Sequence, residues 1–486
     1  MEFASYRAVN FIDFSEKIKP EDTNWLNGIK KKSILTKHTF DIISFSGPTL
    51  FRLIEFNFIH MTKIQSLGIP FQLSGFDILG SAQTGSGKTL AFAIPIIEFI
   101  HTIKWSSKNG TASVIISPTR ELTIQTYHVF RDLLHYHHHS HGILMGGANR
   151  KTEIEKLKKG QEILITTPGR FLDHLKSTKD FKFKNLQQVV IDEADRCLEV
   201  GFEDELNEIF RILPKKKQTI MFTATKKKQF NIFSFFTKKK KPILIDLEEK
   251  THESECKNII HGFTICHIEE KLLLLIMLIK KNLDKKMIIF FSSCNEVKFF
   301  SSLFKLLNIS VIELHGKQKQ IKRISSFFSF CRSGHSILFS TDLAARGLDI
   351  PEVDWIIQYS PPLDPKEYIH RAGRTGRGVK GKGKAILFLL PSEIGFLRHL
   401  KKENIEMIEF KFPKLGVTRI QTKIEELVEK NFYLEKLAKD ALKSFIQSYN
   451  NYSLKEIFDL KKINKSYLFK SFGISPLKKT SLGFSY

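Results

Sequence analysis

Residues 82–89 read Ala82-Gln83-Thr84-Gly85-Ser86-Gly87-Lys88-Thr89, between the strand-like Asp77–Gly80 and a helical run that opens at Leu90. Glycines in such a loop let successive backbone N–H groups converge on phosphate oxygens, and the following helix N-terminus adds partial positive charge. Lys88 can reach the β and γ phosphates of a nucleotide, and the Thr89 hydroxyl can ligate Mg²⁺. Ala82 replaces the first glycine of the general pattern. The order strand, glycine loop, helix predicts a phosphate-binding α/β domain.

Short apolar strands alternate with longer helical stretches along most of the 486-residue chain, which predicts two tandem α/β domains with parallel sheets and a helical C-terminal extension. The expected segments are an N-terminal arm at 1–39, a nucleotide-binding domain at 40–247, a charged linker at 248–258, a second domain at 259–405 and the extension at 406–486. The expected strands are Val114–Ser117, Ile163–Thr166, Val189–Asp192, Thr219–Phe222, Met287–Phe291, Val311–Leu314, Ile337–Ser340, Trp355–Gln358 and Ala385–Leu390. Apolar spacing over Ile424–Lys443, continued over Tyr449–Phe472, predicts the helices of the extension.

An acidic cluster ends the strand Val189–Asp192, about a hundred residues after the phosphate loop. Asp192 suits Mg²⁺, directly or through water. Glu193 suits the orientation and deprotonation of an attacking water, and Asp195 suits a bond to a neighbouring hydroxyl. An acidic tetrapeptide alone is usually a solvated loop, but its position at a strand end indicates a nucleotide site.

An arginine-rich segment lies in the second domain and contains His370, Arg371, Arg374 and Arg377 among glycines. Guanidinium groups bind phosphoryl oxygens in bidentate fashion and stabilise the charge that develops on them. If Arg374 and Arg377 reach the γ-phosphate held by the first domain, the site is complete only when the two domains close. The alternative is a basic patch that touches nucleic acid.

The overall charge indicates a polyanionic partner: 76 Lys and Arg stand against 51 Asp and Glu, a formal charge of +25. The alternative is compositional drift, because Lys and the 43 Phe both have AT-rich codons. Five cysteines without a CxxC pair favour a reducing compartment over a disulfide scaffold. No apolar run approaches a membrane span, and the N-terminus carries no charged-then-apolar leader, so we expect no membrane association and no secretion.

Further motifs make the chain resemble the DEAD-box ATP-dependent RNA helicases over roughly residues 40–405. Asp-Glu-Ala-Asp is literal at 192–195, and Phe58 with Gln65 is similar to the adenine-reading Q motif of that family. The resemblance implies two RecA-like domains, with ATP and Mg²⁺ as cofactors and RNA as partner. It further implies ATP contacts from Gly347 and Asp349, and coupling of hydrolysis to strand separation through Asp195, Thr223, Ala224 and Thr225. The implied RNA-facing residues are Pro118, Thr119, Arg120, Gly146, Gly147, Thr167, Pro168, Gly169, Arg170, Gln320, Arg323, Thr341 and Asp342.

A narrower resemblance is to the nucleolar "helicase associated with Set" subfamily, carried by Gly146–Arg150, Phe291–Asn295, His315–Gln320 and Pro391–Leu397. It implies a monomeric core in the nucleus and nucleolus that acts on pre-ribosomal RNA or small nucleolar RNA duplexes, with pre-ribosomal proteins as further partners. Asn57, where most members have glycine, and Met61, where proline is commoner, depart from the pattern. Two alternatives are an ATP-gated RNA clamp with little unwinding, whose motifs would be identical, and a DNA helicase, against which the Q motif and the 2′-OH-compatible motifs argue.

Two further features carry weaker signals. The tract with His135, His137, His138, His139 and His141 has no carboxylate or cysteine beside it in sequence, so we expect a solvated loop or helix end rather than a metal site. The lysine runs Lys215–Lys217, Lys226–Lys228 and Lys238–Lys241 suit a solvated surface, an import signal or an RNA-facing patch.

Overall fold

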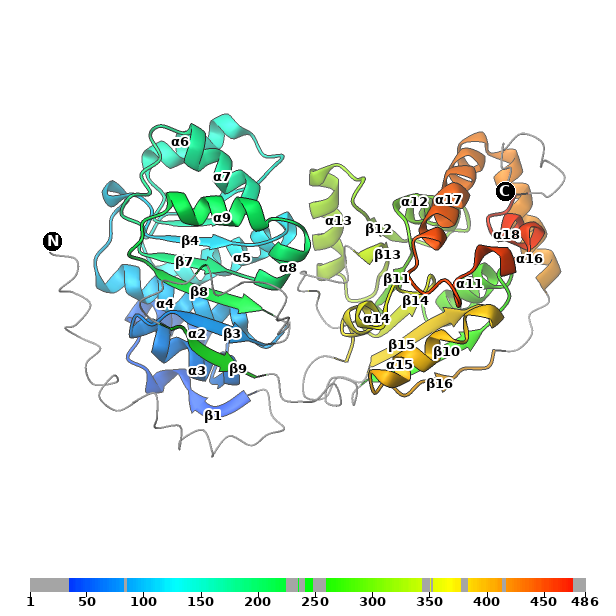
Figure 1. Ribbon diagram of the computed structural model, residues 1–486, viewed down its shortest axis with the longest axis horizontal. Coiled ribbons are helices and arrows are strands. Elements are labelled where there is room, and N and C mark those ends of the chain that lie inside the picture. The colour runs from blue at the N-terminus through cyan, green and yellow to red at the C-terminus, as the bar shows by residue number, and fades with distance from the viewer. Residues whose placement is uncertain are drawn as a thin grey trace. The chain divides into compact units, whose positions relative to one another are not determined.

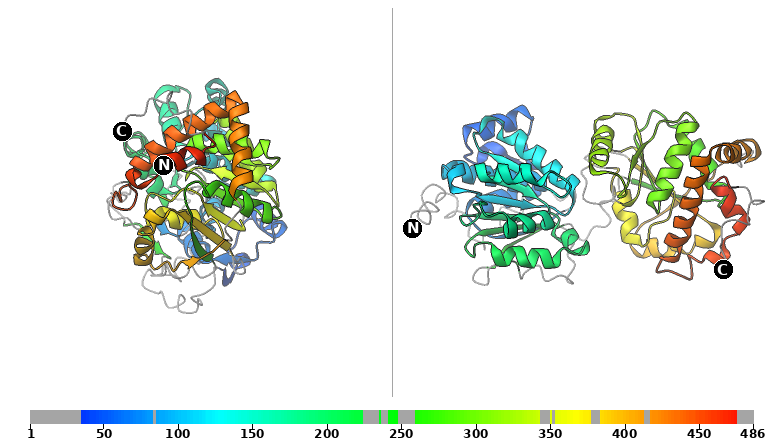
Figure 2. Two further views of the ribbon diagram at one scale, coloured as in Figure 1. Left: turned by 90° about the vertical axis from the view of Figure 1, so that its right-hand side faces the viewer. Right: turned by 90° about the horizontal axis from the view of Figure 1, so that it is seen from above.

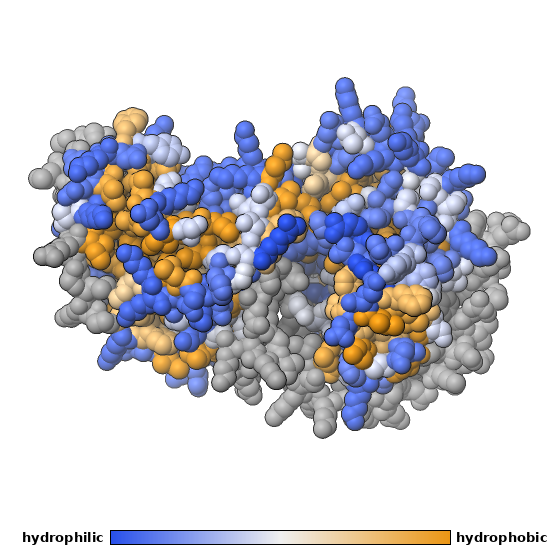
Figure 3. All heavy atoms as spheres, turned by 180° about the vertical axis from the view of Figure 1, so that it is seen from behind, coloured by the Kyte–Doolittle hydropathy of each residue, from blue (hydrophilic) through white to orange (hydrophobic). Residues whose placement is uncertain are grey.

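The computed structural model describes residues 35–82, 85–223, 235, 241–247, 259–342, 350, 353–376, 383–412 and 417–474. The chain divides into two compact units, Met1–Glu249 and Lys250–Tyr486, hereafter units 1 and 2 (Figures 1 and 2). Within the described ranges, no helix combines the length and the apolar character needed to cross a membrane. Hydrophilic side chains project from the face drawn in Figure 3, with hydrophobic patches between them.

Unit 1 contains a seven-stranded sheet in the order β5-β6-β4-β7-β8-β3-β9, in which each recorded strand pair is parallel. All side chains of the central strands β4, β6, β7 and β8 are buried, as expected for a parallel sheet covered on both faces. The strands are β3 (Ile78–Ser81), β4 (Ser113–Ile116), β5 (His141–Leu144), β6 (Ile163–Thr166), β7 (Gln188–Ile191), β8 (Gln218–Thr223) and β9 (Ile243–Asp246).

Helices cover both faces of this sheet (Figure 1). Ile115 and Val190 pack into one hydrophobic core, while their neighbours Val114 and Val189 pack into the other, because successive side chains of a strand point to opposite faces. The first core takes in α2 (Gly47–Glu55), α3 (Lys63–Leu73), α4 (Lys88–Thr102) and α5 (Arg120–Leu133). The second takes in α6 (Arg150–Lys159), α7 (Pro168–Ser177), α8 (Ala194–Glu199) and α9 (Glu203–Ile212).

Unit 2 repeats this architecture with a parallel sheet in the order β12-β13-β11-β14-β15-β10-β16. Its strands are β10 (Ile259–Ile265), β11 (Met287–Phe290), β12 (Ile312–Leu314), β13 (Ile337–Ser340), β14 (Trp355–Gln358), β15 (Gly383–Leu389) and β16 (Ile408–Glu409). Its helices are α11 (Lys271–Lys281), α12 (Cys294–Leu306), α13 (Gln320–Arg332), α14 (Pro365–Ala372) and α15 (Phe396–Lys402).

The C-terminal extension adds α16 (Val417–Lys430), α17 (Phe432–Asn450) and α18 (Lys465–Ser471) to unit 2. Helix α17 lies along α12, where Asn295 Nδ2 donates to Ser444 Oγ at 2.7 Å (Figure 1). Phe472, beyond α18, packs against the rings of Phe299 and Phe300. The extension therefore completes the hydrophobic core of unit 2.

Three details differ from the sequence-based expectations. Residues 35–39, placed in the arm, form strand β1 (Leu35–Thr39), which pairs with β2 (His60–Thr62). The helical pattern over 424–443 is divided at Asn431, whose side chain accepts a hydrogen bond from Leu434 N and caps a new helix. The pattern over 449–472 is likewise divided, because α17 ends at Asn450 and α18 begins at Lys465.

Candidate ATP and RNA site

The motifs of unit 1 gather at one edge of its sheet, because the carboxyl ends of parallel strands lie together. The phosphate loop follows β3, the acidic cluster follows β7, and Thr223 is the last residue of β8. The segments containing Pro118, Gly146 and Thr167 follow β4, β5 and β6 at the same edge. Ala82 N donates to Thr223 O at 3.1 Å, so the phosphate loop begins beside the predicted coupling motif.

The phosphate loop leads directly into α4, whose first residue is Lys88. Gly85 and Gly87 have φ values of 81° and 90°, in the left-handed region that glycine adopts without a Cβ penalty. Lys88 is buried, and its Nζ donates to Ala82 O at 2.8 Å across the loop. The ammonium group is therefore held inside the curl, where phosphate oxygens of a bound nucleotide would compete for it.

The Q-motif residues are placed beside this loop. Gln65 Oε1 accepts from Thr62 N at 2.8 Å, and its Nε2 donates to Gly87 O at 3.1 Å. In this arrangement the amide group fixes the phosphate loop, a role that the expectation of adenine reading had not included. Phe58 is 41% exposed, which leaves its ring accessible for stacking on a base. Asn57, which stands where most members of the resembled subfamily have glycine, has φ 56°, a conformation that Asn tolerates better than most residues.

The acidic cluster turns sharply at the end of β7. Asp192 N donates to Ile116 O, which prolongs the sheet by one residue. Glu193 then adopts φ 50° and ψ 55°, the left-handed conformation, and is the N-cap residue of α8. Burial raises the pKa of Asp192 above its usual range, Glu193 raises it further, and the Lys88 ammonium opposes the rise. A buried carboxylate with this environment fits a divalent cation, which would offset the cost of burying its charge.

The residues of unit 1 that are expected to face RNA differ in the contacts that their side chains already make. Thr119 and Thr167 are the N-cap residues of α5 and α7. A Cβ on Gly146 would lie 2.8 Å from Arg120 Nη2, so only glycine leaves room for the Arg120 guanidinium there. Arg170, by contrast, donates to Glu153 Oε2 at 2.7 Å and to Ala148 O at 3.0 Å.

Glu153, which no sequence motif indicated, is the centre of this buried network. It also accepts from Met145 N at 3.0 Å and bonds His174 Nε2 at 2.9 Å. Arg170 therefore holds the loop that carries Gly146 and Gly147, rather than offering a fully free guanidinium to RNA. The polar sequence around Glu153 gave no signal for this role, because its partners lie 8 to 21 residues away.

The motifs of unit 2 follow β13 and lie on α13 and α14. Gln320 and Arg323 occupy the first turn of α13, and Thr341 follows β13 directly. Asp342, expected to face RNA, accepts a bidentate pair from Arg371 at 2.6 and 2.9 Å. Arg371 is 1% exposed, so this ion pair fixes α14 against the loop after β13.

The predicted arginine finger Arg374 is buried just beyond α14, and its Nε lies 3.4 Å from His370 O. Seven predicted site residues lie outside the part of the chain that the structure describes: Gln83, Thr84, Ala224, Thr225, Gly347, Asp349 and Arg377. The linker at 248–258 and two of the three lysine runs lie outside it as well, apart from Lys241.

Comparison with known protein families matches three segments of the chain. The DEAD/DEAH box helicase family matches residues 62–232, and the helicase conserved C-terminal domain matches residues 270–379. The C-terminal extension of SPB4-like ATP-dependent rRNA helicases matches residues 431–479, which include α17 and α18.

Individual proteins are similar over nearly the whole chain. ATP-dependent RNA helicase HAS1 of Saccharomyces cerevisiae is 46% identical over 91% of this chain and 88% of its own length. The has1 helicase of Schizosaccharomyces pombe is 47% identical over 92% of this chain and 78% of its own length. A solved structure of Mss116p bound to single-stranded RNA and AMP-PNP superposes with a TM-score of 0.78, at 27% identity over 90% of both chains. These likenesses, together with the motifs at the sheet edge, show that the chain belongs to the DEAD-box family of ATP-dependent RNA helicases.

Proposed function

We propose that this protein uses ATP hydrolysis to open short RNA duplexes during the assembly of ribosomal precursors in the nucleus and nucleolus. The observation that carries the proposal is that the segments with Lys88, Asp192 and Gly146 each follow the carboxyl end of a strand of the same sheet in unit 1. A nucleotide bound by the first two would share this edge of the sheet with the segments proposed to contact a sugar-phosphate chain, so one sheet would connect the two ligands.

In the proposed ATP site, Lys88 and the N–H groups of residues 83–88 bind the β and γ phosphates. Thr89 and Asp192 hold Mg²⁺, which neutralises charge on the phosphates when bound. Glu193 orients the attacking water and accepts its proton, while Phe58 stacks on adenine and Gln65 keeps the loop in register. From unit 2, Gly347 and Asp349 contact the nucleotide, and His370, Arg374 and Arg377 face its γ-phosphate and stabilise the charge transferred to the leaving group.

The proposed RNA path uses backbone and hydroxyl contacts at Thr119, Gly147, Thr167 and Gly169, with Arg120 and Arg323 against phosphates. Such contacts recognise the shape of the strand and its 2′-hydroxyls rather than base sequence. ATP and RNA each favour the closed arrangement of the two units, so each tightens the binding of the other. Closure bends one strand, and a duplex that cannot follow the bend opens locally.

The ribosomal assignment rests on the extension. Relatives named HAS1 align over nearly the whole chain, and the family that matches residues 431–479 is the C-terminal extension of SPB4-like rRNA helicases. Pre-ribosomal RNA or small nucleolar RNA pairings are accordingly the proposed substrates, and the protein acts as a monomer. Crosslinking the protein to cellular RNA and sequencing the adducts would identify them.

The test is ATP turnover measured with RNA, with DNA of the same sequence and with neither. We expect strong stimulation by RNA only, loss of turnover in Lys88→Ala, and unchanged turnover in Lys108→Ala, which removes an exposed lysine elsewhere in unit 1. Glu193→Gln should retain ATP and RNA while blocking hydrolysis. Equal stimulation by DNA would favour a DNA helicase. Failure to separate a short duplex, despite RNA-stimulated turnover, would favour the clamp.

A further inference from the structure

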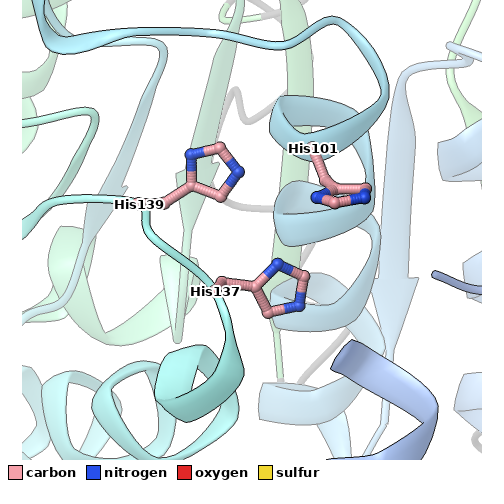
Figure 4. A group of neighbouring side chains, drawn as sticks. All are labelled: His101, His137 and His139. Carbon is pink, nitrogen blue, oxygen red and sulfur yellow. The ribbon is translucent and has the colours of Figure 1, made fainter. Parts of the chain in front are cut away.

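Three histidines that belong to none of the ATP-site or RNA motifs lie close together in unit 1. His101 lies in the last turn of α4, while His137 and His139 lie between the short helix η6 (Leu134–Tyr136) and β5. One ring nitrogen of each lies within 4.8 Å of the others, and the three rings surround a common space (Figure 4). The sequence predicted a solvated loop or helix end here, because no carboxylate or cysteine stands beside the tract; His101 is distant along the chain and was not part of that expectation.

Each of the two loop histidines is oriented by a hydrogen bond on its other nitrogen. His139 Nδ1 bonds Glu162 Oε2 at 2.6 Å, which leaves Nε2 for the common space. His137 Nε2 bonds Thr49 Oγ1 at 3.0 Å, and Thr49 in turn donates to the buried Glu98. His137 Nδ1 is buried and has no hydrogen-bond partner among the residues described. Metal-binding histidines show this same arrangement, in which a carboxylate or another polar group fixes the far nitrogen.

The burial of His137 Nδ1 carries a cost that a bound cation would relieve. A buried ring nitrogen without a partner loses its hydrogen bond to water and gains none in return. Because the Thr49 hydroxyl donates to Glu98, it accepts from His137 Nε2–H, so Nδ1 of His137 keeps the lone pair that a ligand bond requires.

We propose that His101, His137 and His139 bind one divalent transition-metal ion of the zinc type, with water as the fourth ligand. Imidazole nitrogen suits Zn²⁺ and its neighbours in the first transition row and is a poor ligand for Mg²⁺ or Ca²⁺. Zinc–nitrogen bonds of about 2.0–2.1 Å place tetrahedral ligand atoms roughly 3.4 Å apart. The present nitrogens lie within 4.8 Å of one another, which is wider than that spacing, and the exposed His101 side chain has the freedom to close the difference.

The site's position gives it a structural role. Lys88 and His101 stand at opposite ends of α4, about 20 Å apart at the rise of an α-helix. The metal would fasten the segment 137–139 to the end of α4, on the side of unit 1 where Thr49 of α2 also packs. We therefore expect metal to stabilise unit 1 and to leave the chemistry at the phosphate loop unchanged.

The experiment uses the full chain, produced without a polyhistidine tag and stripped of metal with a chelator. Zn²⁺ is added in competition with a chromophoric zinc chelator. We expect one tightly bound Zn²⁺ per chain, its loss in His101→Ala, and its retention in His138→Ala. The second variant is the matched control, because His138 is an exposed histidine of the same tract outside the group of three.

Two further readouts make the result independent of folding defects. Saturating Zn²⁺ should raise the melting temperature of the unmodified chain and of His138→Ala by several degrees, but not that of His101→Ala. With Mg²⁺ supplied, RNA-stimulated ATP turnover of zinc-free His101→Ala should equal that of the zinc-free unmodified chain, which shows that the variant is folded. Equal zinc content of the two variants, or no bound zinc on the unmodified chain, would overturn the proposal.

Discussion

Gly87 shows how tightly a single residue of the phosphate loop is constrained. Its φ is 90°, and a Cβ at this position would lie 2.5 Å from Gln65 Nε2, the atom that donates to Gly87 O. Gly85, two residues earlier, has φ 81°, but a Cβ added there would meet nothing within 4 Å among the described residues. The two glycines therefore share a backbone requirement and differ in their surroundings.

We expect Gly87→Ala to weaken ATP binding by at least about tenfold, the equivalent of about 1.4 kcal/mol. The alanine carries the cost of a left-handed conformation and also displaces the Gln65 amide from the loop. Gly85→Ala carries the backbone cost alone and should have the smaller effect. Equilibrium binding of a fluorescent ATP analogue measures both, and an equal loss in the two variants would mean that the Gln65 contact does not matter.

Glu296 provides a pH-dependent test of unit 2. It is fully buried at the start of α12, where the Ser292 and Ser293 hydroxyls donate to its Oε2, and burial raises its pKa from 4.5 to about 7. The folded state therefore holds a proton that the unfolded state has already released between these pH values. The stability due to this proton is complete below pH 4.5 and is lost as the pH rises through 7.

We expect the free energy of unfolding of unit 2 to lose about 3 kcal/mol from this group between about pH 4 and pH 8, since one pKa unit is worth about 1.4 kcal/mol. Glu296→Gln removes the titration and should flatten this part of the pH dependence. Pulsed hydrogen exchange along a urea titration, read in peptides of β11 and α12, measures it. A variant with the same pH dependence as the unmodified chain would contradict the assignment.

At the scale of elements, the C-terminal extension contacts the segment that holds Arg371 of α14 in place. Tyr452 follows α17, stacks on Phe458 at 4.2 Å, and donates its hydroxyl to Pro361 O at 2.5 Å. The neighbouring Ser360 O accepts from Arg371 Nη1 at 2.8 Å, and Arg371 also pairs with Asp342. One short segment, 360–361, thus joins the extension to the motifs after β13 and on α14.

Tyr452→Phe keeps the stacked ring and removes only this hydrogen bond, leaving the buried Pro361 carbonyl without its donor. The expected cost to the stability of unit 2 is about 1–3 kcal/mol, together with a several-fold loss of RNA-stimulated ATP turnover. Phe432→Ala, which truncates an 83% exposed ring in the same extension, is the control. Thermal unfolding and steady-state turnover separate the two effects. Turnover equal in both variants would show that the extension does not support the motif.

The regular elements were accessible from the sequence because buried parallel strands are continuous apolar runs. Ile163–Thr166, Ile337–Ser340 and Trp355–Gln358 were predicted with the bounds that the structure gives. The break between α16 and α17 was missed, because apolar spacing runs through Asn431 and only the cap ends it. Periodicity reports which face is buried, but a cap depends on a competition between local hydrogen bonds.

The sequence predicted the candidate site only where the residues of a motif are consecutive. The phosphate loop and the acidic cluster each carry their chemistry within a few consecutive residues, so their place at one sheet edge followed from strand order. The partners of Arg170 and Asp342 are Glu153 and Arg371, 17 and 29 residues away, and no local pattern names them. The same limit hid His101, which only the fold brings to the histidine tract.

At the scale of the whole molecule, the proposed reaction needs groups from both units. Lys88, Asp192 and Glu193 belong to unit 1, while His370 and Arg374 belong to unit 2. A coupling of this kind is reciprocal, so RNA must tighten ATP binding by the same factor by which ATP tightens RNA binding. Measuring both factors on one preparation tests the closure hypothesis without reference to hydrolysis.

Arg374→Lys tests the contribution of unit 2 to the chemical step. Lysine keeps the positive charge but loses the planar fork that binds two phosphoryl oxygens, and arginines in this role contribute roughly 10³-fold or more to kcat. We expect RNA-stimulated turnover to fall at least about 100-fold, while unit 1 alone still supports most of the affinity for ATP. Because Arg374 is buried, thermal unfolding must show that the variant remains folded. Turnover within a few-fold of the unmodified chain would mean that Arg374 does not reach the transferred phosphate, and the contribution of unit 2 would then have to come from His370 and Arg377.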